Sequence, residues 1–189
     1  MPEEYKLKHF KKNNCSNCPK KIDCIEKDLL CDSIKRIIVS EMVEECTGFY
    51  RVFEHLKPIT FLKMDIQEIG KEQYQKNDQL FCPCVVCGIF AAELAMKILI
   101  FEENTIFQKG HDIQELYKNL PNIHKQIIHD RLEKGKRLDS LSVDDEIDKL
   151  KNHFVKWRYG YESLNGLQAD IFIETLVETI CNYVLNELG

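Results

Sequence analysis

Residues 109–120, "KGHDIQELYKNL", place a histidine and an aspartate side by side after a glycine. A carboxylate can orient an imidazole, so His111 and Asp112 have the side chains of a general acid–base pair. Asp112 also has a structural explanation, because Glu115 follows three residues later and an apolar stripe begins between them. This spacing is typical of a helix N-cap with a capping-box partner. We therefore assign Asp112 to the start of a helix and keep His111 as the candidate acid–base residue.

A second polar cluster, "WRYGYE", occupies residues 157–162. Its chemically useful members are one arginine, two tyrosines and one glutamate: Arg158, Tyr159, Tyr161 and Glu162. An arginine can bind a phosphate through its planar guanidinium, and a tyrosine can stack on a base. The glutamate can orient the arginine or accept a proton. The alternative is a helix C-terminus at the glycine, where a cation complements the helix dipole. His111 joins this cluster if the fold brings the two segments together.

Nine cysteines form the third group, and seven of them fall in two short stretches: Cys15, Cys18, Cys24 and Cys31, then Cys82, Cys84 and Cys87. The charged N-terminal stretch lacks the apolar core of a signal peptide, so we expect a cytoplasmic protein with reduced thiols. The C-x2-C spacing lets two thiolates reach one ion, and the first stretch holds enough sulfurs for tetrahedral zinc.

That zinc set has one geometric difficulty. A helix running from Cys24 through Cys31 would separate their sulfurs by about 10 Å along its axis. In that case "CPCVVC", residues 82–87, supplies the fourth ligand. An iron–sulfur cluster uses the same ligands, and free thiols are the remaining alternative.

Apolar residues recur every three or four positions nearly everywhere, which predicts helices. The first runs from Ile34 to Pro58, and a second, buried on all sides, follows Pro83. Further helices are expected over 112–120, 121–135, 142–157 and 172–184, the fifth capped by Ser142 and Asp145. Glu93 and Lys97, four apart in the buried helix, are expected to form an ion pair. The residues expected on inner helix faces include Ile37, Cys46, Ile123, Phe172, Ile173, Leu176, Ile180, Cys181 and Val184. No strand pattern competes. We predict an all-α fold, an antiparallel bundle of four to five long helices over residues 33–189, preceded by a short cysteine-rich N-terminal arm, residues 1–32.

The length, composition and charge of the chain limit the classes of protein to which it can belong. With 189 residues, 44% of them apolar, the chain can bury one substantial core. No run of about eighteen apolar residues is present, so we expect no membrane span. The net charge of −5 disfavours general coating of nucleic acid but allows a local basic site. Neither a Gly-rich phosphate loop nor a G-x-S-x-G elbow occurs.

The order of a buried helix "GIFAAELAMKILIF", then "GHDIQELYKNLP", then "FVKWRYGYE" resembles the HEPN superfamily over about residues 34–187. These are all-α domains of prokaryotic defence and toxin–antitoxin systems and of RNA-processing proteins. The resemblance implies a helical bundle, a homodimer and an RNA or nucleotide ligand, and many members are metal-independent ribonucleases. Their signature is an arginine followed by a histidine after four to six residues. Here Arg51 and His55 have only three between them, and family members without the signature are regarded as binding domains.

We therefore expect an RNA- or nucleotide-binding homodimer, part of a defence or toxin–antitoxin module, with a cognate antitoxin or nucleotidyltransferase as partner. The sequence leaves catalysis open. One alternative is an endoribonuclease with a non-standard site made by His111, Arg158 and Glu162. Another is a protein-interaction or regulatory module whose cysteine arm senses metal or redox state.

Overall fold

The computed structural model describes residues 32–60, 71–135, 141–151 and 171–188. Within these ranges the chain forms six helices and no strand, which confirms the all-α fold class. The helices are α3 (Asp32–Thr60), α5 (Lys71–Asn104), α6 (Ile113–Lys118), α7 (Asn122–Gly135), α8 (Val143–Lys149) and α10 (Ile171–Leu188). The arm of residues 1–32 lies, except for Asp32, outside the described residues.

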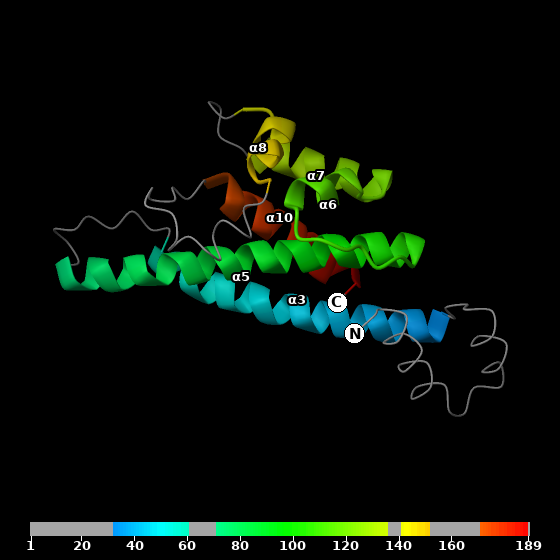
Figure 1. Cartoon of the computed structure of the whole chain (residues 1–189), viewed down its shortest axis with the longest axis horizontal. Helices are drawn as coiled ribbons and strands as arrows, with labels where there is room; N and C mark the ends of the chain where they lie inside the picture. The colour runs from blue at the N-terminus through cyan, green and yellow to red at the C-terminus, as the bar shows by residue number, and fades with distance from the viewer. Residues whose placement is uncertain (1–31, 61–70, 136–140, 152–170, 189) are drawn as a thin grey trace.

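The three long helices pack against one another, but not all are antiparallel as predicted, because α5 and α10 each run opposite to α3 and so run in the same direction. Lys57, near the end of α3, pairs with Glu174 and Glu178 near the start of α10. Lys35, near the start of α3, lies 3.3 Å from Glu102 near the end of α5. Helix α3 therefore runs opposite to both α5 and α10, and α6, α7 and α8 lie on the side of α5 away from α3 (Figure 1).

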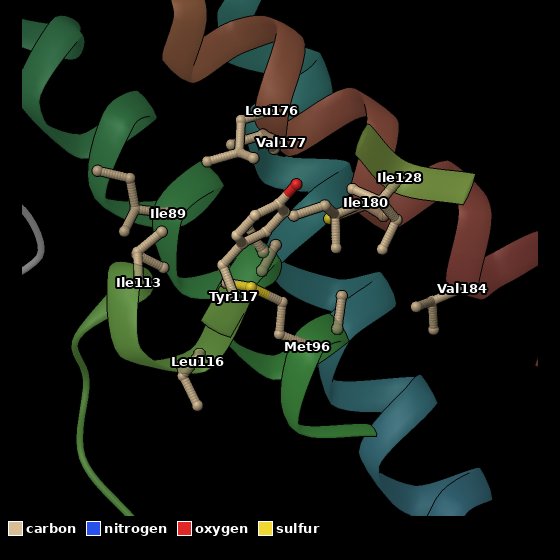
Figure 2. Packing of buried hydrophobic residues seen from close by; sticks show 14 of the residues in the cluster. Ile89, Met96, Ile113, Leu116, Tyr117, Ile128, Leu176, Val177, Ile180 and Val184 are labelled. Carbon is tan, nitrogen blue, oxygen red and sulfur yellow. The ribbon is translucent and has the colours of Figure 1, made fainter. Parts of the chain in front are cut away.

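Helix α5 is the centre of the core. Almost every side chain from Cys84 to Phe101 is fully or partly buried, as its all-round apolar sequence predicts. The residues expected to line the inner face of α10 are all buried: Phe172, Ile173, Leu176, Ile180 and Val184. Figure 2 shows several of them packed around Tyr117 and Met96. The bundle thus buries its apolar faces against one central helix.

One segment of α5, Leu80–Asn104, is long and apolar enough to cross a membrane by length and composition. A count of consecutive apolar residues missed it, because Glu93 and Lys97 interrupt the run. However, 72% of its most apolar window is buried inside the protein. That burial is typical of a core helix, which has the same composition for a different reason.

Both predicted proline boundaries are wrong. Helix α3 continues past Pro58 to Thr60, and α5 begins at Lys71, twelve residues before Pro83. Pro58 lies in the last turn, where the Thr60 hydroxyl donates to the Leu56 carbonyl at 3.0 Å. At Pro83 the helix loses one backbone hydrogen bond, yet α5 packs along α3, and Cys84, the next residue, is buried with its thiol 3.8 Å from the Phe53 carbonyl.

Three smaller expectations also need correction. The helix that begins after Ser142 was predicted to continue to residue 157, but α8 ends at Lys149 and Leu150 is its C-cap. The predicted stripes included Ile37 and Ile123, which are exposed. Ile123 is the second residue of α7, ahead of the turns that reach the core through Ile128. The caps at Ser142 and the end of α7 at Gly135 are confirmed.

Candidate functional site

Most of the sequence-predicted site residues lie outside the described residues: Arg158, Tyr159, Tyr161, Glu162, Cys15, Cys18, Cys24 and Cys31. Their roles stay predictions. The structure places His111, which lies just before α6, and the three alternative metal donors of α5.

Asp112 is the N-cap of α6. Its carboxylate accepts hydrogen bonds from the backbone N–H of Gln114 at 2.9 Å and of Glu115 at 3.4 Å. The cap prediction is confirmed. Because these bonds satisfy N–H groups that have no partner inside the helix, the helix start accounts for Asp112.

His111 has a different carboxylate partner. Its Nδ1 lies 2.9 and 3.0 Å from the two carboxylate oxygens of Glu93, a residue of α5 that is 18 positions earlier in the chain. The Glu93 side chain is 0% exposed, whereas that of His111 is 55% exposed. The pair therefore joins a carboxylate inside the core to an imidazole that reaches solvent.

A lysine completes the cluster. Lys97 lies one helical turn beyond Glu93, and its Nζ is 2.8 Å from a Glu93 carboxylate oxygen. The spacing of four residues had predicted this ion pair, which is confirmed. A buried carboxylate is costly unless a charge and hydrogen bonds compensate it, and Lys97 and His111 together supply both. We call Glu93, Lys97 and His111 the buried-carboxylate cluster.

The segment between α5 and α6 brings His111 over Glu93. Gly110 has φ of +90°, in the left-handed region that favours glycine, and His111 follows it directly. On the other side of His111, α6 is held by three buried residues, Ile113, Leu116 and Tyr117. Figure 2 shows Tyr117 pointing into the core beside Met96 of α5. His111 is thus fixed by a turn before it and a packed helix after it.

Tyr117 also links α6 to α7. Burial raises the pKa of Tyr117 to about 12, so its hydroxyl stays protonated at neutral pH. That hydroxyl lies 3.2 Å from His129 Nδ1 on α7. The contact ties the short helix that positions His111 to a longer one.

The buried-carboxylate cluster has the chemistry of a general base. A carboxylate bonded to Nδ1 favours the tautomer that carries its proton there, which makes Nε2 the basic nitrogen. The same carboxylate stabilises the imidazolium that forms when the ring accepts a proton. Sequence reasoning kept His111 but missed Glu93 as its partner. One sequence feature could have pointed to Glu93, because Glu93 and Lys97 are the only charged residues between Cys84 and Phe101.

The three alternative metal donors are spread around α5. Cys84 and Cys87 are about 60° apart around the helix axis, while Cys82 is about 160° from Cys84. Cys84 is buried and Cys82 is exposed. Burial raises the pKa of the Cys84 and Cys87 thiols, which disfavours the thiolate form that a metal needs. The structure brings Cys84 and Cys87 to one side and leaves Cys82 on another.

Comparison of this chain with models of known protein families, with curated proteins and with solved structures gave no match.

Proposed function

We propose that this protein binds RNA or a nucleotide at a site containing His111, and that His111 transfers a proton there during cleavage of an RNA phosphodiester. One observation carries the catalytic part, namely the contact between solvent-reaching His111 and fully buried Glu93. The class of ligand comes from the resemblance of the helix order and short motifs to HEPN domains. The dimer, the defence or toxin–antitoxin role and a cytoplasmic location belong to the same proposal.

The proposed step uses the RNA's own nucleophile. His111 accepts the proton of a 2′-hydroxyl, and the 2′ oxygen attacks the adjacent phosphorus. The bond from phosphorus to the 5′ oxygen breaks, and that oxygen takes a proton from water. The hydroxide left behind takes the proton held by His111, which restores both the water and the neutral imidazole. The products are a 2′,3′-cyclic phosphate and a 5′-hydroxyl. Glu93 stabilises the His111 imidazolium, and Lys97 Nζ pairs with the same carboxylate at 2.8 Å.

The test compares two neighbouring residues whose structural roles differ. His111→Ala should lower the rate of cleavage of a short fluorescent RNA by about 100-fold or more while leaving RNA binding intact. Asp112→Ala should lower the free energy of unfolding by about 0.5–2 kcal/mol and leave the cleavage rate of the folded fraction unchanged. Because the two variants are purified in the same way, Asp112→Ala also controls for contaminating nuclease.

Two results would separate the parts of the proposal. Binding without cleavage by the unmodified protein would leave a non-catalytic RNA-binding domain. Loss of cleavage in Asp112→Ala at unchanged stability would mean that the adjacent aspartate, and not Glu93, serves His111. Arg158→Ala should weaken binding with little effect on stability, because a guanidinium pairs strongly with phosphate.

A further inference from the structure

Two carboxylates and one imidazole converge at the end of α5. The ligand atoms of Glu102, Glu103 and His124 all lie within 4.8 Å of one another. The two glutamates belong to the last turn of α5, and His124 is the third residue of α7. We propose that these three residues bind a divalent cation, and we call them the α5–α7 site.

The electrostatics favour a cation at this point. Glu102 and Glu103 are adjacent, so their negative charges repel each other, and the C-terminal end of a helix adds partial negative charge. Lys35 lies 3.3 Å from a Glu102 carboxylate oxygen and offsets part of this charge. A divalent ion would compensate both carboxylates at once.

His124 is already held in a fixed orientation. Its Nδ1 lies 2.7 Å from the hydroxyl of Tyr183, whose side chain is buried in α10. Metal-binding histidines characteristically have their second nitrogen engaged in this way, because the hydrogen bond fixes the ring and its tautomer. The rigid core position of Tyr183 therefore prepares His124 to act as a ligand before any ion arrives.

The donor set indicates which ions fit. Two carboxylate oxygens with one imidazole nitrogen form a mixed oxygen and nitrogen site, which suits Mn²⁺ or Zn²⁺. Three protein ligands leave at least one coordination position for water or a ligand. No thiolate belongs to this donor set, so it has no ligand in common with the zinc site predicted in the cysteine arm. The inference also does not rest on the proposed function, because it involves none of the buried-carboxylate cluster.

Mn²⁺ alone is the right probe, since it prefers oxygen and nitrogen ligands and binds thiolates weakly. The full chain is titrated at about 0.1 M salt, which screens scattered surface charge, and free Mn²⁺ is measured by electron paramagnetic resonance. One saturable site per chain is expected. His124→Gln and Glu103→Gln should each raise the Kd at least as much as loss of an outer-shell partner does, about 10–100-fold.

A matched control is available on the same helix. His129 also belongs to α7, and its Nδ1 also contacts a tyrosine hydroxyl, that of Tyr117, at 3.2 Å. Because His129 is not one of the three clustered residues, His129→Gln should leave the Kd for Mn²⁺ unchanged. Glu103 is exposed, so Glu103→Gln retains the fold even if His124→Gln does not. The absence of saturable binding, or an unchanged Kd in Glu103→Gln, would overturn the site.

Discussion

The clearest energetic consequence of the buried-carboxylate cluster is its dependence on Lys97. Lys97→Met keeps an unbranched side chain of similar length but removes the ammonium that lies 2.8 Å from Glu93. The carboxylate then remains in the core beside His111, and a histidine compensates charge only when it is protonated. The substitution should therefore destabilise the folded protein well beyond what loss of a surface lysine does.

The magnitude follows from exposure. A surface ion pair contributes about 0–1 kcal/mol, whereas removing one partner of a buried pair costs about 3–5 kcal/mol. Glu93 is 0% exposed and Lys97 is 16% exposed, which places this pair in the buried class. The hydrogen bond from His111 is retained and offsets part of the loss. We expect Lys97→Met to lower the free energy of unfolding by about 2–3 kcal/mol.

Urea unfolding followed by circular dichroism measures this change, with the slope of the transition checked for constancy. Replacing both members, Glu93→Leu with Lys97→Met, removes the unpaired charge. Stability should then return to within about 1 kcal/mol of the unmodified protein, since apolar residues commonly replace a buried pair at little cost. The double variant should nevertheless lose cleavage, because His111 has lost its carboxylate.

Lys118→Met is the matched control. Lys118 Nζ lies 3.4 Å from Asp148 Oδ1, and their side chains are 57% and 56% exposed, so its loss should cost less than about 1 kcal/mol. Equal effects of Lys97→Met and Lys118→Met would refute the reasoning, because burial would then make no difference to the pair. A double variant less stable than Lys97→Met would refute it as well.

Four further predictions concern packing, titration, metal and assembly. A Cβ at Gly88 would lie 2.6 Å from the buried Phe53 ring, so Gly88→Ala should lower the free energy of unfolding by about 1–3 kcal/mol. Gly48→Ala, where a Cβ meets nothing within 4 Å, should instead raise it by about 0.5–1 kcal/mol. Burial raises the pKa of Tyr117 to about 12, so the folded state holds that proton more tightly than the unfolded chain does. This contribution to the free energy of unfolding is present below about pH 10 and is lost as the pH rises through about 12. In Tyr117→Phe, urea unfolding at a series of pH values should show a smaller decrease over the same range. Elemental analysis of protein purified without chelator should find about one zinc per chain in the cysteine arm, and less than about 0.2 zinc or iron would contradict it. The proposed two-fold homodimer, which buries on the order of 1,200 Å² or more, should sediment with the mass of a dimer. A monomer at tens of micromolar would contradict it.

Helical periodicity and capping were readable from the sequence for clear physical reasons. Asp112 and Ser142 are N-caps as predicted, because a short oxygen-bearing side chain at a helix start bonds N–H groups whatever surrounds the helix. The inner face of α10 was also predicted correctly, since its apolar residues repeat at the period of one helix face. Cys46 and Cys181 lie in the core as their apolar neighbours indicated.

The proline boundaries failed because they are local rules that packing can override. A proline inside a helix removes one hydrogen bond and crowds one carbonyl, at a cost of about 3 kcal/mol. Helix α5 offsets that cost at Pro83 through its packing against α3, which includes the approach of the Cys84 thiol to the Phe53 carbonyl at 3.8 Å. The sequence shows the proline, but it does not show which distant helix lies alongside it.

Glu93 was not predicted as the partner of His111, because the sequence does not show which distant segments lie side by side. That Glu93 needs some further partner could have been inferred. A glutamate inside an otherwise apolar, buried helix requires compensation, and the lysine four residues later satisfies only part of it. A further donor therefore had to come from another element. Its identity depended on where the chain turns after α5, which Gly110 and the buried face of α6 determine. Asp112, next to His111 in sequence, was the more obvious partner, yet its bonds to backbone N–H groups belong to the helix start. Adjacency in the sequence suggested that His111 pairs with Asp112, whereas in the structure His111 contacts the buried Glu93.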